Sequence, residues 1–181
     1  DSREIAEIAI EYGASVPFLR STENSNDYAT TEDVLREVLQ EYKMRDKQFN
    51  IMCCIYPTAP FITPEKLCES MDIIEKSNQS ALMPVVQYSY PPQRSFSIKD
   101  GMLVYRYPEY VTSRSQELEP IYHDCGQYYI HKIDSNNNFY TEQFIPYIVS
   151  ELEVQDIDNL TDWEIAEMKY KLMEQRMRKN V

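Results

Sequence analysis

The pair Asp156 and Asp158 is the strongest local signal for chemistry in this sequence. Two residues that are two positions apart on a strand lie on one face, with their Cα atoms about 7 Å apart. Mg²⁺ keeps several waters and takes one or two carboxylates together with substrate phosphates, so this pair could hold a nucleotide-bound ion. The alternative is a solvated turn between a strand and a helix, because Asp is favoured in turns and at helix N-caps. Asp162 is expected to cap the helix that follows.

Other polar side chains that could hold an anion lie upstream of this pair. Arg114 and Gln116 fall in a loop before a strand, where a guanidinium group could bind a carboxylate through two hydrogen bonds. The alternative for Arg114 is an ordinary surface position. Arg94 opens an expected hairpin, where it could contact an anion or only discourage aggregation at a sheet edge.

Composition and charge exclude several classes of protein. The formal net charge of −12 argues against binding to nucleic acid or to an anionic membrane. No apolar stretch approaches the roughly 20 residues that span a bilayer, and no signal peptide opens the sequence, so a cytoplasmic location is expected. The 4 cysteines and 2 histidines have no disulfide or zinc spacing, so any metal must be bound by oxygen. With 3 glycines, the chain has no glycine-rich phosphate loop.

Hydrophobic periodicity predicts one α/β domain over residues 1–181. Helices are expected at residues 1–12, 31–42, 64–76 and 161–179, with Asp1, Thr30, Thr63 and Thr161 at their N-caps. Strands or extended segments are expected at residues 14–19, 49–56, 80–87, 127–132 and 154–157. The run at 49–56 is apolar without alternation, which is typical of a central parallel strand. A mainly parallel sheet follows, with ligands beyond the carboxyl ends of its strands and the turn at Pro57 at such an end.

A hairpin is predicted between these elements, with strands at 94–98 and 102–106 and a turn at Lys99-Asp100-Gly101. Five tyrosines gather around it: Tyr88, Tyr90, Tyr105, Tyr107 and Tyr110. Tyrosine clusters suit interfaces, although ordinary cross-strand packing is the alternative. We favour an interface, because an isolated hairpin is only marginally stable.

Three segments occur in an order that resembles the acylneuraminate cytidylyltransferase family. They are YPTAPF at 56–61, TSRSQELEPIYHDCGQYYI at 112–130 and VQDIDNLTDWEIAE at 154–167. Within that family the chain is most similar to the pseudaminic acid cytidylyltransferases, which share VPFLR, here 16–20, and the TAPF form of the proline turn. The resemblance covers essentially the whole chain.

The resemblance implies roles for residues that pattern alone leaves open. Asp156 and Asp158 would be the catalytic, Mg²⁺-binding aspartates, and Arg114 and Gln116 would face the sugar. The pocket floor would be lined by Tyr56, Pro57 and Thr58. Two further substrate-binding positions, Asp124 and Gln127, lie where the neuraminate enzymes carry Asn-Gly-Ala, and Tyr56 stands where those enzymes carry glutamine. Both departures indicate a sugar other than neuraminate.

The resemblance also implies a Rossmann-like fold of the nucleotide-diphospho-sugar transferase type and a homodimer built through an inserted arm at 89–122. The family begins with a strand, a phosphate-binding loop, a helix and a second strand ending in Ser-Thr-Asp. Asp1 corresponds to that aspartate, so we expect an N-terminally truncated chain that is inactive alone.

The implied activity is transfer of CMP from CTP to the anomeric hydroxyl of a nine-carbon acidic sugar, with release of pyrophosphate. Pseudaminic acid is favoured. Two alternatives remain open. One is the same reaction on neuraminic, legionaminic or 3-deoxy-octulosonic acid. The other is a non-catalytic homologue that keeps only the dimer fold.

Overall fold

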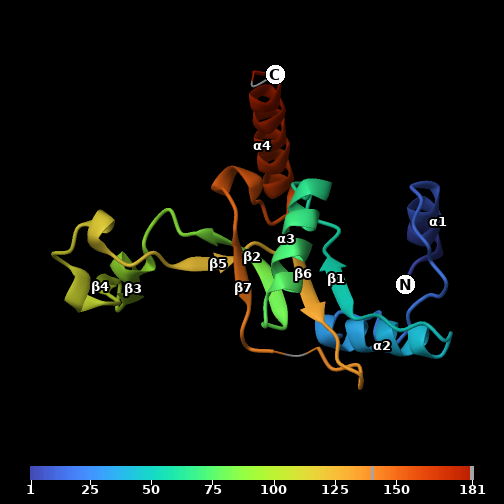
Figure 1. The fold of residues 1–181 in the computed structure, drawn as a ribbon. Coiled ribbons are helices and arrows are strands. Elements are labelled where there is room, and N and C mark those ends of the chain that lie inside the picture. Colours follow the sequence, from blue (N-terminus) through green and yellow to red (C-terminus); the bar gives the residue numbers. More distant parts are fainter. Residues whose placement is uncertain (140, 180–181) are drawn as a thin grey trace. The chain divides into compact units, whose positions relative to one another are not determined.

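The computed structural model describes residues 1–139 and 141–179, and it forms two compact units (Figure 1). The first unit comprises residues 1–54 and 132–140, and the second comprises residues 55–131 and 141–181. The single domain expected over residues 1–181 stays a prediction, since neither unit alone tests it.

The first unit contains helices α1 (Arg3–Glu11) and α2 (Thr31–Lys43), and strand β1 (Ile51–Ile55) begins in it. The predicted capping box of α2 is confirmed, because Thr30 and Asp33 each accept the other's backbone N–H. The predicted cap of α1 is wrong by one residue: Ser2 caps this helix, and Asp1 pairs with Arg20 at 3.0 Å instead.

A small apolar core holds the first unit together. Leu39 of α2 packs with Ile133 and Phe139, and the half-buried Leu35 and Met52 cover this cluster. Residues 14–19 form no strand and remain extended. The core of this unit therefore depends on α2, the start of β1 and the segment that returns at residues 132–139.

The second unit is organised around β2 (Ala81–Gln87), which is buried on both faces. It pairs with β5 (Tyr122–Asp124), β6 (Tyr128–Lys132) and β7 (Ile145–Ile148). Val85 pairs with Asp124 of β5 and with Ile148 of β7, so these two strands lie on opposite edges of β2. Because β6 also shares its β2 partner Leu82 with β7, β5 and β6 follow each other along one edge.

The sheet of the second unit is mixed, so the expectation of a mainly parallel sheet is wrong for the pairings of β2. Strand β7 runs parallel to β2, whereas β5 and β6 run antiparallel to it. The chain leaves β2 at Gln87 and returns directly opposite at Tyr122, and such a return produces an antiparallel pair. The sequence patterns also missed β5 and β7, and residues 154–157 form no strand.

Two helices complete the second unit. Helix α3 (Pro64–Lys76) begins at the predicted cap, with Thr63 accepting the backbone N–H of Lys66. Helix α4 (Leu160–Lys179) begins one residue before the predicted start, and its cap is Asn159 rather than Thr161. The Asn159 side chain accepts the N–H of Asp162, and Asp162 accepts the N–H of Asn159, which confirms the capping role expected for Asp162.

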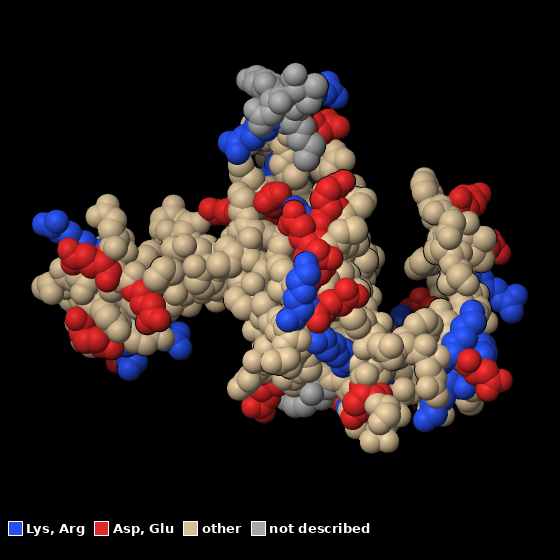
Figure 2. Space-filling model, viewed as in Figure 1, with Lys and Arg blue, Asp and Glu red and all other residues tan. Residues whose placement is uncertain are grey.

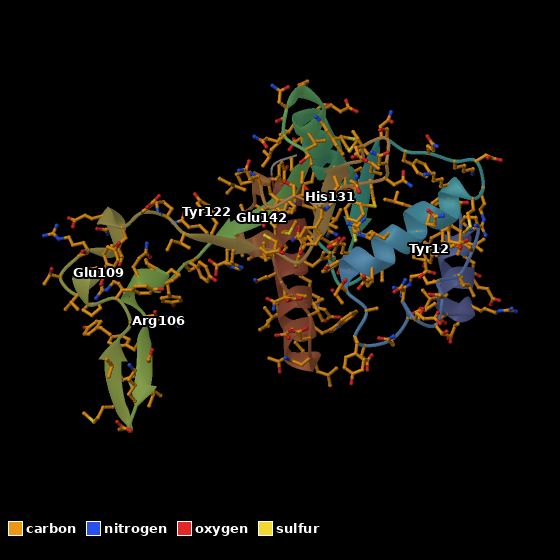
Figure 3. All side chains as sticks on the ribbon, turned by 90° about the horizontal axis from the view of Figure 1, so that it is seen from below. Tyr12, Arg106, Glu109, Tyr122, His131 and Glu142 are labelled. Carbon is orange, nitrogen blue, oxygen red and sulfur yellow. The ribbon has the colours of Figure 1, made fainter. Side chains whose placement is uncertain are left out.

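The predicted hairpin is confirmed as β3 (Phe96–Lys99) and β4 (Met102–Tyr105), which pair antiparallel. Its turn residues Asp100 and Gly101 both have positive φ, 51° and 77°, as a type I′ turn requires. We call residues 88–121, which connect β2 to β5, the arm. The arm stands away from the sheet in Figure 1, and Figure 3 shows Arg106 and Glu109 on it and Tyr122 where the chain rejoins the sheet.

The surface of the second unit is strongly acidic along α3. Four exposed acidic residues lie on this helix: Glu65, Glu69, Asp72 and Glu75. Figure 2 shows acidic side chains gathered over it. Within residues 1–139 and 141–179, no helix is both long and apolar enough to cross a membrane.

Candidate functional site

An interruption between β5 and β6 shapes the candidate site. Pro84 lies opposite it in β2 and has no backbone N–H to donate, although its carbonyl oxygen accepts the N–H of Cys125 at 3.3 Å. Gly126 then turns the chain in the left-handed region, with φ of 60°. Its N–H donates to Oδ1 of Asp124 at 2.8 Å. The carboxylate of Asp124 therefore holds the turn that separates the two strands.

The other carboxylate oxygen of Asp124 accepts a hydrogen bond from the hydroxyl group of Tyr129. Burial of the Tyr129 side chain, and then this hydrogen bond, raise the pKa of the phenol above its usual value. The ring of Tyr129 meets that of Tyr56 edge to face, with centroids 5.4 Å apart. Both oxygens of Asp124 are thus engaged by the chain itself.

Asp156 lies against this turn. A Cβ atom placed on Gly126 would be 3.7 Å from Oδ1 of Asp156, so the glycine backbone lies close to this carboxylate with no side chain of its own between them. Asp156 and Asp158 are both exposed, and the described part of the chain shows no hydrogen bond or ion pair to either carboxylate group. They follow the short 3-10 helix η4 (Glu151–Glu153) in an extended turn that leads to α4.

Residues 154–157 form no strand, so the alternation of side chains along a strand no longer places Asp156 and Asp158 on one face. The backbone matches the alternative interpretation, a solvated turn before a capped helix. Their role in metal binding is not tested by this backbone and stays a prediction.

A cavity of about 440 Å³ opens beside Asp156, which is within the usual range of small-molecule sites. Its walls come from the end of β2, the start of the arm, β5, the turn after β7 and α4. The lining residues that carry polar or aromatic groups are Gln87, Tyr88, Ser89, Tyr90, His123, Asp124, Glu151, Gln155, Asp156 and Lys169.

Several details of this cavity bear on its chemistry. The rings of Tyr88 and His123 are tilted by 46° to each other, with centroids 4.5 Å apart. Burial raises the pKa of the Cys125 thiol to about 12, so this cysteine is no nucleophile at neutral pH. Lys169 is the only Lys or Arg among the described residues that line the cavity. The cavity thus combines an aromatic wall, carboxylates and one ammonium group.

The structure brings together only part of the predicted site. Asp124 and Asp156 both line the cavity, whereas Asp158 lies two residues further along the chain and is not among the lining residues. Gln127 is buried, with 1% of its surface exposed, and donates its amide N–H to the carbonyl oxygen of Glu153. Its carbonyl Oε1 has no hydrogen-bond partner among the described residues.

The remaining predicted residues lie outside this cavity. Tyr56, Pro57 and Thr58 form the turn after β1, where the Tyr56 N–H donates to the carbonyl oxygen of Gln127 at 2.9 Å. Arg94, Arg114 and Gln116 lie on the arm. The guanidinium group of Arg94 donates to the hydroxyl of Ser115 at 3.4 Å, which ties the two halves of the arm together.

Sequence reasoning missed Lys169. A signal for it exists: the more buried positions of α4 recur with helical spacing, at Asp162, Ile165, Ala166, Lys169 and Met173. A lysine on the more buried face of a helix needs a partner for its charge, so Lys169 could have been proposed as a residue with a specific contact.

The donor set near the cavity fits one kind of metal ion. Among the described residues, no three His, Cys, Asp or Glu side chains gather into a cage. Asp156 and Asp158 are instead two exposed carboxylates for which the described residues provide no hydrogen-bond or ion-pair partner. Such a pair fits Mg²⁺, which keeps its waters and takes its remaining ligands from substrate phosphates.

Comparison with known proteins identifies the class of this chain. A family model described as cytidylyltransferase matches residues 1–180, and the chain therefore belongs to the cytidylyltransferase family.

Individual relatives point to acidic sugars. The chain is 30% identical over 179 residues to a pseudaminic acid cytidylyltransferase of Campylobacter jejuni, covering 95% of this chain and 76% of the relative. It is 34% identical over 185 residues to a CMP-N,N'-diacetyllegionaminic acid synthase of Legionella pneumophila, covering 96% of this chain and 75% of the relative. A longer Helicobacter pylori protein, named as a pseudaminic acid cytidylyltransferase and a hydrolase, is 29% identical over 181 residues, which are 98% of this chain and 34% of that protein.

Proposed function

We propose that this protein transfers CMP from CTP to the anomeric hydroxyl group of pseudaminic acid and releases pyrophosphate. The sugar oxygen forms a bond to the α-phosphorus, the bond from that phosphorus to the pyrophosphate oxygen breaks, and the hydroxyl proton passes to solvent. The observation that carries the proposal is the family match together with two unpartnered carboxylates, Asp156 and Asp158, beside a polar cavity. The Campylobacter jejuni relative supports the choice of sugar.

The chemistry needs no covalent protein intermediate, and catalysis would rest on positioning and charge. Asp156 and Asp158 would hold Mg²⁺, which supplies neutralisation of the phosphate charge. Asp124 would keep the Gly126 turn in place against Asp156.

Sugar recognition is proposed for the turn and for the arm. Tyr56, Pro57 and Thr58 would line the sugar pocket, with Gln127 behind them through its bond to the Tyr56 N–H. Arg94, Arg114 and Gln116 would face a carboxylate from the arm. Because these three lie outside the cavity of their own chain, they would serve the site of a neighbouring copy.

A homodimer built through the arm is therefore part of the proposal. Both faces of the hairpin are open: Ile98, Met102 and Leu103 are 75%, 70% and 68% exposed. Contiguous apolar surface of this kind marks an interaction site, and a hairpin alone is marginally stable. Light scattering that gives the mass of a single chain at micromolar concentration would contradict the dimer.

Legionaminic acid is the second candidate sugar. The Legionella pneumophila relative has 34% identity, and it too covers nearly the whole chain. The reaction and the metal site would be unchanged, and only the contacts to the sugar substituents would differ. The expected cytoplasmic location stays a prediction.

Pyrophosphate release from CTP tests the reaction and the sugar together. The assay would use the full-length protein with pseudaminic, legionaminic, neuraminic and 3-deoxy-octulosonic acids. We expect turnover, fastest with pseudaminic acid. Faster turnover with legionaminic acid would replace the sugar but keep the reaction, and no turnover with any sugar would favour the non-catalytic homologue.

Matched variants test the role of the aspartate pair. Asp158→Asn should lower turnover by about 100-fold or more, because a metal ligand is worth several kcal/mol of transition-state stabilisation. Asp72→Asn is the control, since Asp72 is an exposed carboxylate on α3 that pairs only with Lys76 among the described residues. If the two substitutions lower turnover equally, Asp158 is not a metal ligand.

A further inference from the structure

Side chains from three separate elements hold the turn that leads to Asp156. Lys169 of α4 donates from its ammonium group to the carbonyl oxygen of Val154 at 2.5 Å and to that of Glu151 at 3.2 Å. Gln127 donates to the carbonyl oxygen of Glu153. Lys66 of α3 pairs with the Glu153 carboxylate at 2.9 Å. The backbone from 151 to 154 is thus held at three carbonyl oxygens, those of Glu151, Glu153 and Val154, and the Glu153 carboxylate is held as well.

The contact to Val154 has the most direct consequence for Asp156. The Val154 side chain is buried in a cluster with Val86, Cys125 and Val149, so this residue is held at both its side chain and its carbonyl oxygen. Two residues after Val154, the Asp156 carboxylate lies close to Gly126, where an added Cβ atom would be 3.7 Å from Oδ1. Loss of the Val154 contact would free the peptide units between Val154 and Asp156 while the apolar cluster stayed in place.

Packing alone does not explain a lysine at position 169. Removing an ammonium group from water costs free energy unless the group is paired, and an apolar side chain of similar length would cover the same surface. The Lys169 ammonium group uses two of its three N–H donors in hydrogen bonds to backbone carbonyl oxygens of one turn. It also lines the same cavity as Asp156. A lysine is useful here because it can bind two carbonyl oxygens of a turn that makes no regular backbone ladder.

We propose that Lys169 is a positioning residue for Asp156: its contacts to the carbonyl oxygens of Glu151 and Val154 hold the turn so that the carboxylate is presented to a divalent cation. This inference rests on the proposed metal site. It assigns to α4 the task of presenting a ligand that comes from the preceding turn.

The charge of Lys169 acts in the opposite direction, which makes the proposal testable. A positive group near a cation site weakens cation binding by repulsion, so a purely electrostatic role predicts tighter binding when Lys169 is neutralised. A positioning role predicts weaker binding when both donors are lost. Lys169→Met removes charge and donors, whereas Lys169→Gln removes the charge and keeps one N–H donor group.

The test measures the affinity of the whole chain for Mn²⁺ by electron paramagnetic resonance, with urea unfolding of each variant as a check on folding. Loss of an outer partner of a metal ligand typically lowers metal affinity 10- to 100-fold. We expect Lys169→Met to lower the affinity by about 10-fold and Lys169→Gln to lower it less. Hydrogen exchange of the amides at 151–156 should be faster in Lys169→Met. The control is Lys171→Met, since Lys171 lies on the same helix and pairs only with Glu167 among the described residues.

The outcomes separate this inference from the proposed function. If the unaltered chain and Asp156→Asn bind Mn²⁺ with equal affinity, the proposed metal site is wrong. If Asp156→Asn weakens binding but Lys169→Met binds as tightly as the unaltered chain or more tightly, the site stands and the positioning role is wrong. If Lys169→Met does not fold, Lys169→Gln decides: weaker binding with unchanged unfolding free energy supports the proposal, and tighter binding overturns it.

Discussion

Gly126→Ala is the substitution for which the structure makes the sharpest prediction. Gly126 has φ of 60°, in the left-handed region that costs a residue with a Cβ atom about 1–2 kcal/mol. The new methyl group would meet Asp156 at 3.7 to 3.9 Å, which is ordinary van der Waals contact, so no steric cost is added. We therefore expect the free energy of unfolding to fall by about 1–2 kcal/mol, through backbone strain alone.

Gly101→Ala provides the matched control. Gly101 has φ of 77°, but an added Cβ there would have no neighbour within 4 Å. The two variants should therefore lose similar stability in urea titrations, and each kcal/mol should lower Tm by about 2–4 °C. Only Gly126→Ala places a methyl group in contact with the Asp156 carboxylate, so only this variant should weaken Mn²⁺ binding. Gly126→Asn should be less destabilised, because Asn tolerates the left-handed region.

Two results would refute this reasoning. If Gly126→Ala is as stable as the unaltered chain, the turn does not require the left-handed conformation. If Gly101→Ala weakens Mn²⁺ binding as much as Gly126→Ala does, the effect arises from general destabilisation and not from contact with Asp156.

Two further predictions concern buried and charged groups away from the cavity. Tyr128→Phe should lower the free energy of unfolding by about 1–3 kcal/mol, because the fully buried Ser70 hydroxyl loses its 2.7 Å hydrogen bond, and adding Ser70→Ala should recover part of the loss in urea titrations. The Ser21 backbone N–H, and then the side chains of Asn24 and Ser21, lower the pKa of Glu37 below its ordinary 4.5, so Glu37 stabilises the fold above that pH and the benefit is lost as the pH falls through the lowered pKa. The difference in unfolding free energy between the unaltered chain and Glu37→Gln should therefore be constant near neutral pH and shrink below about pH 4.5, and a difference that does not change with pH would contradict it.

Local patterns predicted the elements whose signals are local. The capping residues Thr30 and Thr63 begin α2 and α3 as expected, and Asp100-Gly101 forms the expected hairpin turn. The apolar run of β2 is buried on both faces. In each case a short stretch of chain contains the donor, acceptor or φ preference that decides the outcome, so distant residues are not needed.

Strand direction and the cap of α4 illustrate where such patterns end. An apolar stretch of sequence does not indicate the direction of the neighbouring strand. The antiparallel pairing of β5 with β2 follows from the path of the arm between Gln87 and Tyr122. At α4, both Asn159 and Thr161 are suitable caps by type, and the reciprocal bonds of Asn159 and Asp162 decide between them.

The sequence by itself determined the family, through three ordered motifs, and it determined which side chains are chemically able to bind a hard cation. Tertiary structure alone decided that Asp156 lies close to Gly126 and that Lys169 holds the turn before Asp156. The physical reason is range. Caps and turns depend on bonds between residues a few positions apart, whereas a ligand's position depends on packing among elements that meet only when the chain has folded.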